Sequence, residues 1–371
     1  MMPLVSSISS SAASSPPASR QGSVSLDRAW ILADDLTGAC DAAVAFLKTG
    51  LSVRVWTGAQ PSFSAPEAVQ AVNTDSRALT LDEAEKAVSR SAAALGKGDR
   101  TLFFKKVDST LRGPIAAELK AAQEGFGARA ILFAPAFPAA GRTVRNGILE
   151  VEDISGRRDA IRIRDIFPRG TRDNVACVAG ADGISLALER GKPVIVCDSG
   201  TQADLGALAR AAQPHHGLLY AGSAGLAQAI AGLYASPVTP ARIPEAKCTL
   251  VVCGTTHPVT ELQIRHLDRR RFAGVELLYI RCEGGDEERV RAAFETVHFQ
   301  AMVLTGGNAA LLALRALGVH SLVLRGECAL GIPWGVADGG IANGATVVTK
   351  SGGFGAASAL NDILAMLAGR A

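Results

Sequence analysis

Short apolar runs recur along the chain, each followed by a loop of small or polar residues and then by a longer amphipathic segment. This alternation is typical of a mainly parallel β-sheet flanked by helices. The runs lie at 29–33, 68–72, 101–104, 130–133, 194–197, 218–221, 249–252, 301–304 and 345–348. The sequence therefore predicts an α/β fold.

The length of the chain predicts two domains. A chain of 371 residues exceeds the size at which one hydrophobic core usually suffices. Three prolines, Pro237, Pro240 and Pro244, interrupt the pattern and indicate a linker. We therefore expect each half to have its own mainly parallel sheet. The expected segments are an N-terminal α/β domain at 28–235, a linker at 236–247 and a C-terminal α/β domain at 248–371.

Residues 1–27 are rich in Ser, Ala and Pro, a composition that predicts a disordered tail. An organelle transit peptide is the alternative, but it would carry more basic residues than the single Arg20. No apolar run reaches the roughly 18 residues of a membrane-spanning helix. We expect neither a membrane-spanning segment nor a secretory signal.

Charge and cysteine usage exclude several classes of protein. The 38 Lys and Arg side chains nearly balance 35 Asp and Glu, so the formal net charge of +3 does not favour a nucleic-acid or anionic-membrane partner. The seven cysteines are scattered and form no C-x-x-C pair, which argues against a zinc site or a disulfide framework. Reduced thiols in a cytoplasmic protein are the simpler interpretation.

Acidic and basic residues gather in the loops that follow the strands of the first half. Asp34 and Asp35 follow the first run, Arg77 follows the second, and Asp108 with Arg112 follows the third; Arg142 comes after the fourth. Loops at the carboxyl ends of parallel strands share one edge of the sheet. Arginines there could clamp a carboxylate, and aspartates could accept hydrogen bonds from hydroxyls. A helix N-cap would explain only one of the paired aspartates.

The corresponding loops of the second half are rich in glycine. Gly306-Gly307 and Gly352-Gly353, with Lys350 beside the second pair, could bring backbone N–H groups close to phosphate. Neither loop matches a P-loop or a dinucleotide fingerprint, so tight turns are the alternative. His257 could contact a nucleotide or cap the helix that follows.

A hydrolase is a rival enzyme class, because Ser223 lies between a strand and a helix in a sequence close to the nucleophile elbow. That sequence lacks the first glycine of the motif. The histidines of the first half, His215 and His216, precede the same strand and so lie at its opposite end. Close packing of small residues explains the segment better.

Several loops together resemble those of the four-carbon acid sugar kinases, from about Trp30 to Leu367. The motifs that carry this resemblance are Ala33–Gly38 with Asp41, Lys106–Gly113, Ala134–Pro138 with Gly141 and Arg142, Thr305–Gly307, and Thr349–Gly355. The resemblance implies transfer of phosphate from ATP, with Mg²⁺, to the terminal hydroxyl of threonate, erythronate or 3-oxo-tetronate. It implies an active site in the cleft between the two domains. It leaves open a homo-oligomer.

The resemblance also implies a division of labour between the domains. Asp35 would be the base or hydroxyl anchor and Arg112 the carboxylate or transition-state clamp. The sugar acid would be held by Asp34, Asp35, Arg77, Asp108, Ser109, Thr110, Arg112, Gly141 and Arg142. ATP would be held by Thr255, His257, Gly306, Gly307, Asn308, Ala309, Lys350, Gly352 and Gly353.

Two loops depart from the family pattern. Asn308 stands where the family usually has an acidic residue, and Thr255-Thr256-His257 replaces a serine-rich loop. Because an amide carries no charge, the affinity for metal or nucleotide could change. These departures motivate an alternative function, a sensor that binds a sugar acid or nucleotide without turnover.

Overall fold

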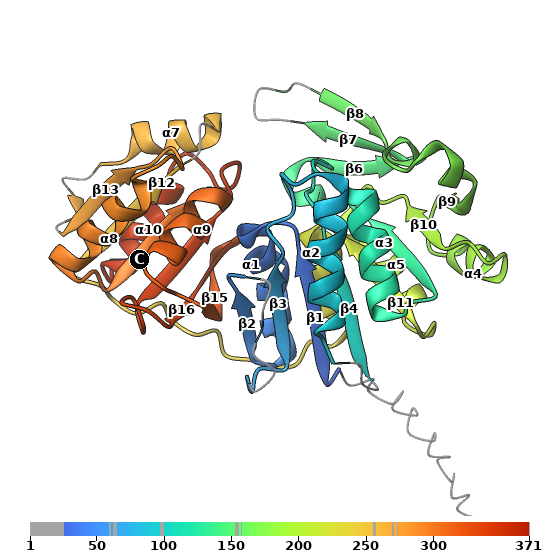
Figure 1. Ribbon diagram of the computed structural model, residues 1–371, viewed down its shortest axis with the longest axis horizontal. Helices are drawn as coiled ribbons and strands as arrows, with labels where there is room; N and C mark the ends of the chain where they lie inside the picture. Colours follow the sequence, from blue (N-terminus) through green and yellow to red (C-terminus); the bar gives the residue numbers. More distant parts are fainter. Residues whose placement is uncertain are drawn as a thin grey trace, which may run out of the picture.

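The computed structural model describes residues 26–58, 61, 65–96, 100–152, 156, 158–254, 257–268, 271–272 and 274–370. The predicted tail thus lies outside the described residues, apart from Leu26 and Asp27. Helices and strands alternate as predicted (Figure 1). The helices are α1 (Leu36–Val44), α2 (Leu81–Ala93), α3 (Ile115–Phe126), α4 (Gly183–Glu189), α5 (Gln202–Ala212), α6 (Ala224–Leu233), α7 (Pro258–His266), α8 (Asp286–Val297), α9 (Gly307–Ala316) and α10 (Ala359–Leu367).

One large, mainly parallel sheet runs through the described part of the molecule. Its antiparallel members are β15 and β16, which form a hairpin. From one edge to the other the strands are β13 (Val275–Tyr279), β12 (Thr249–Cys253), β14 (Ala301–Thr305), β17 (Thr346–Lys350), β16 (Ile332–Asp338), β15 (Ser321–Ala329), β2 (Val53–Trp56), β3 (Val69–Asn73), β1 (Arg28–Ala33), β4 (Thr101–Lys106), β11 (Leu218–Gly222), β5 (Ala130–Ala134), β10 (Val194–Cys197) and β9 (Val175–Val178). The predicted α/β class is confirmed.

The two halves share this sheet, whereas the sequence predicts a separate sheet for each. The join is an antiparallel ladder in which Val53–Trp56 of β2 pairs with 321–324 of β15. An unpaired edge strand exposes a row of backbone N–H and C=O groups. Pairing β2 with β15 satisfies both edges at once, which is the physical reason for the single sheet.

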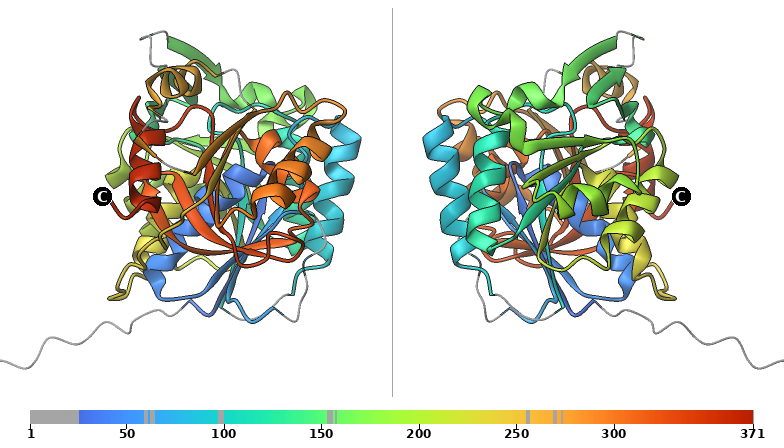
Figure 2. Two further views of the ribbon diagram at one scale, coloured as in Figure 1. Left: turned by 90° about the vertical axis from the view of Figure 1, so that its left-hand side faces the viewer. Right: turned by 90° about the vertical axis from the view of Figure 1, so that its right-hand side faces the viewer.

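Helices cover both faces of the sheet, as the end-on views show (Figure 2). Alternate residues of β1 point to opposite faces: Trp30 and Leu32 pack in the cluster that includes α2 and α3. Ala29, Ile31 and Ala33 pack in the cluster that includes α1, α5 and α6. Every residue of β1 after Arg28 is buried, which explains why its sequence is a continuous apolar run.

The charged region 143–190 contains most of a separate antiparallel sheet. Its strands are β6 (Arg142–Arg145), β7 (Ile148–Glu152) and β8 (Arg158–Arg162). The predicted linker, 236–247, contains neither helix nor strand. The domain boundaries themselves stay a prediction.

Candidate functional site

A cavity of about 460 Å³ lies at the carboxyl ends of strands from both halves of the chain. Loops after β1, β3 and β4 contribute to its wall from one side, and loops after β12, β14 and β17 from the other. Most of the predicted site residues line it: Asp34, Asp35, Arg77, Asp108, Ser109, Thr110, Arg112, Arg142, His257, Gly306, Gly307, Asn308, Gly352 and Gly353.

Four predicted residues are not in this wall. Gly141 directly precedes β6 and Ala309 lies in the first turn of α9, but neither lines the cavity; Thr255 lies outside the described residues. Lys350 is fully buried behind the wall, where its Nζ donates to the carbonyl oxygen of Ser351 at 3.1 Å and of Phe354 at 3.3 Å. Burial lowers its pKa to about 8. In this position Lys350 shapes the glycine loop.

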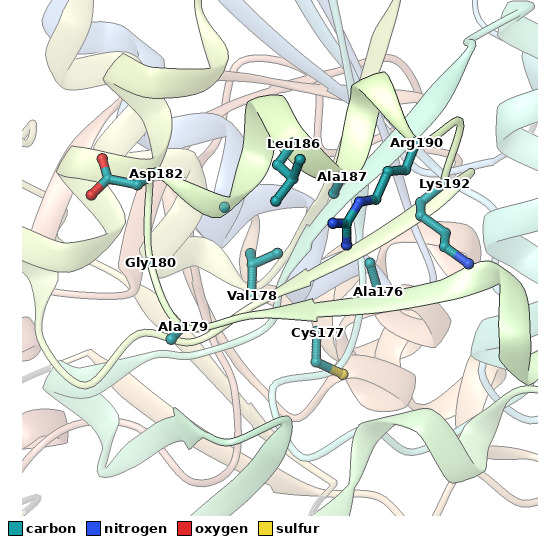
Figure 3. Close-up of a pocket in the computed structure, with 11 residues that line it drawn as sticks. Ala176, Cys177, Val178, Ala179, Gly180, Asp182, Leu186, Ala187, Arg190 and Lys192 are labelled. Carbon is teal, nitrogen blue, oxygen red and sulfur yellow. The ribbon is translucent and has the colours of Figure 1, made fainter.

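A second hollow, of about 540 Å³, lies between β9 and α4 (Figure 3). Its wall is largely aliphatic. Arg190 and Lys192 lie at one end and Asp182 at the other, and none of the predicted residues lines it. The first cavity, where acids, bases and glycine turns meet, is therefore the candidate site.

Asp34 and Asp35 are both bound by Arg77. The guanidinium donates to Asp34 from Nε at 2.8 Å and from Nη2 at 2.9 Å, and Nη2 also donates to Asp35 Oδ1 at 2.7 Å. Burial alone would raise the pKa of Asp34, but Arg77 holds it below its usual value. Asp35 is also the N-cap of α1, since its Oδ1 accepts from the Gly38 N–H at 2.9 Å. Arg77 is thus committed to the protein's own carboxylates.

Asp108 and Arg112 form a second closed pair. Arg112 donates to the two carboxylate oxygens at 2.7 and 2.8 Å, and Thr110 Oγ1 donates to Oδ2 at 2.5 Å. Although burial favours the neutral acid, these contacts and the charge of Arg77 hold the pKa of Asp108 well below its usual value. Two of the three arginines predicted to clamp a carboxylate, Arg77 and Arg112, therefore already hold one of the protein's own.

Arg142 differs from the other two arginines. It lines the cavity, its Nε is buried without a hydrogen-bond partner, and its side chain makes no ion pair with the described residues. Burial lowers its pKa. A partly buried guanidinium whose Nε lacks a hydrogen-bond partner is suited to bind an anionic ligand.

Sequence reasoning missed two buried charged residues as site candidates, Asp41 and Lys106. Both line the cavity and are about 4 % exposed. Asp41 lies inside α1, where an acid usually faces solvent, and Lys106 is the last residue of an apolar strand. A charge within a buried segment is the sequence signal that could have found them.

The glycine turns differ in what they require. Gly306 has φ of +95°, which side chains rarely adopt. Gly307 is needed for close approach, because a Cβ there would lie 2.6 Å from Asp35 Oδ2.

His257 caps α7, with Nδ1 accepting from the Val259 N–H at 3.2 Å. The alternative role predicted for His257, capping of the following helix, is confirmed. His257 also lines the cavity.

The hydrolase alternative finds no support in the geometry. Ser223 is fully buried, donates to the Ala136 carbonyl at 2.5 Å and accepts from the Gly225 N–H at 3.1 Å as the cap of α6. His215 instead lies within 3.1 Å of Ser185. Ser223 therefore has a packing and capping role.

Metal-binding clusters and membrane spans were also sought in the described ranges. No group of three or more His, Cys, Asp and Glu side chains there could hold a metal ion. None of the helices in that part of the chain is long and apolar enough to cross a membrane. All seven cysteines are free thiols.

Comparison with known proteins gives two family matches. A sugar-binding N-terminal domain matches residues 29–173, and a nucleotide-binding C-terminal domain matches residues 287–360. These matches fall on the acidic and the glycine-rich sides of the cavity, respectively.

Curated relatives match most of the chain. The D-threonate kinase of Bordetella bronchiseptica is 31% identical over 88% of this chain and 94% of its own length. The 3-oxo-tetronate kinase of Pectobacterium atrosepticum is 24% identical over 82% of this chain and 91% of its own. A solved Haemophilus influenzae protein shares the fold, with a TM-score of 0.67 and 21% identity over 91% of this chain and 100% of its own. The chain belongs to the four-carbon acid sugar kinase family.

Proposed function

We propose that the chain transfers the γ-phosphoryl group of ATP to the terminal hydroxyl of a four-carbon sugar acid such as threonate, erythronate or 3-oxo-tetronate. The cavity would be the cleft between a sugar-acid-binding domain and a nucleotide-binding domain. The observation that carries this proposal is that anion-binding and hydroxyl-binding groups share one cavity with the glycine turns. The two sides are in contact, since Ser351 Oγ donates to Thr37 Oγ1 at 3.1 Å.

Arg142 is the side chain best suited to hold the substrate carboxylate. It faces the cavity without an ion-pair partner, whereas Arg77 and Arg112 are paired with aspartates. The paired arginines fix the acidic loops in place, and the remaining acceptor capacity of those aspartates faces the sugar hydroxyls. Arg112 is thereby better explained as a positioning residue than as the carboxylate clamp.

The glycine turns suit the phosphates of ATP. Helix α9 begins at Gly307. The first N–H groups of a helix are favourable partners for an anion. The absence of a three-acid cluster in the described chain fits a Mg²⁺ that is held largely by the phosphates. Such an ion would neutralise charge on the phosphates. Asn308, which lines the cavity on this side, could bind ribose or a metal-bound water.

ADP release measured with D-threonate, D-erythronate and 3-oxo-tetronate in the presence of ATP and Mg²⁺ tests the proposal. We expect turnover of at least one acid, at rates that depend on the acid added. A sensor would be thermally stabilised by acid or ATP but would release no ADP. That result would refute the kinase assignment in favour of the alternative.

A further inference from the structure

Asp41 is a buried acid whose role the paired aspartates do not explain. It lies in α1 and lines the cavity, and 4 % of it is exposed. Its Oδ1 is buried with no hydrogen-bond partner, and the carboxylate forms no ion pair with the described residues. An unsatisfied buried carboxylate oxygen costs stability. Its place at a cavity wall points to a function that a ligand completes.

Asp35, the acid that the sequence suggests as base, is less suited to accept a proton. Its Oδ1 accepts from Gly38 and Arg77, and its Oδ2 accepts from Thr37 at 2.8 Å. Accepting a proton would disrupt a helix cap and a contact with Arg77. Asp41 has no such contacts to lose.

Charged groups from several elements influence the pKa of Asp41. Burial is the largest influence and raises its pKa to about 7. Lys106 at the end of β4 and Arg142 of β6 oppose this, while Glu327 of β15 and Asp35 before α1 add to it. Cys40 of α1 is a further neighbour. A base whose pKa is near 7 is well matched to proton transfer at neutral pH.

Asp41 also lies where the acidic and glycine-rich sides meet. A Cβ on Gly331, in the tip of the β15–β16 hairpin, would lie 3.3 Å from Asp41 Oδ1 and 2.6 Å from the Phe354 ring. Phe354 follows the Gly352-Gly353 turn and lines the cavity. On the other side, Lys106 Nζ would lie 3.0 Å from a Cβ on Gly38, one turn before Asp41. The Asp41 carboxylate therefore lies beside the hairpin tip that Phe354 also approaches, and the charge of Lys106 acts on it.

We propose that Asp41 is the catalytic residue that accepts the proton of the substrate's attacking hydroxyl, a role that rests on the proposed kinase function. The hydroxyl oxygen forms a bond to the γ-phosphorus of ATP as the bond from that phosphorus to the β–γ bridging oxygen breaks. The bonding electrons leave with ADP. The hydroxyl proton passes to the Asp41 carboxylate.

The test compares wild type, Asp41→Asn and Glu327→Gln with whichever of the three acids wild type uses. We expect Asp41→Asn to lower kcat at least about 100-fold, with KM for the acid changed less than about threefold. Wild-type kcat should fall as pH drops through about 7, because Asp41 becomes protonated. Asp41→Asn should lose this dependence. Glu327→Gln, which removes a neighbouring negative charge, should shift the midpoint to lower pH with an unchanged plateau.

The outcomes separate this assignment from the kinase proposal. A wild type that uses none of the three acids contradicts both. An active wild type contradicts only the role of Asp41 if Asp41→Asn keeps kcat within about threefold, or loses rate but keeps the same pH dependence. Thermal stabilisation of Asp41→Asn by ATP and by the acid shows that the variant is folded and binds, so a lost rate is not attributable to unfolding.

Discussion

Arg142, alone among the three cavity arginines, lacks a protein carboxylate. We expect Arg142→Ala to raise KM for the sugar acid roughly 10- to 100-fold, because a charge-assisted hydrogen bond contributes about 1.5–3 kcal/mol. KM for ATP should change little. Steady-state kinetics with each substrate varied in turn checks this. Arg145→Ala is the matched control, since Arg145 is an exposed residue of the same strand outside this cavity; an equal effect there would contradict the assignment.

The sequence could identify the charged residues at the cavity but not their pairing. The order of strands and loops predicts that Asp34, Arg77 and Asp108 lie at one edge of the sheet, and the structure places all three in the cavity wall. Which arginine stays unpaired depends on distances of a few ångströms between loops. Asp41 was harder to find because, in sequence, an acid in a helix looks like a solvent-facing residue.

At the level of elements, the N-terminus of α9 abuts Asp35 through Gly307. Glycine-to-alanine changes in helices usually stabilise a protein by about 0.4–1 kcal/mol. We expect Gly307→Ala to do the opposite, because its Cβ would lie 2.6 Å from Asp35 Oδ2. Thermal unfolding checks the sign. The control is Gly232→Ala in α6, where a Cβ would meet no atom within 4 Å; a Gly307→Ala protein as stable as this control would refute the close contact.

The sequence predicts where strands and helices lie better than it predicts which strands pair with one another. Apolar runs and glycine stops locate the strands and several helix ends; Gly50, for example, caps the helical turn after α1 in a left-handed conformation. The helix N-cap that the sequence offers as one explanation for the paired aspartates is made by Asp35, and α1 begins directly after it at Leu36. The β2–β15 ladder joins residues more than 260 positions apart. No local pattern specifies such a pairing.

For the whole molecule, Arg54 of β2 holds the two halves of the sheet together. It binds Glu67 through two contacts of 2.8 Å, Ser321 at 2.6 Å, and Asp338 of β16. Arg54→Ala would leave the buried Glu67 carboxylate without its partner, so we expect a loss of about 2–4 kcal/mol in the free energy of unfolding. Denaturant unfolding measures it.

The matched control for Arg54 is Arg158→Ala, whose ion pair with Glu152 is exposed. We expect that change to stay within about 0.5 kcal/mol of wild type. If Arg54→Ala were equally mild, the network would not stabilise the joined sheet.

The β2–β15 ladder also limits how the cavity can open. A loop at 236–247 alone would let two bodies swing freely, but four residue pairs of β-sheet also connect them. Any movement of one half against the other would then have to twist the sheet along that ladder or break its hydrogen bonds. The phosphate donor and the acceptor hydroxyl would thus meet in an orientation largely set during folding, so little rotational freedom need be lost at each catalytic cycle.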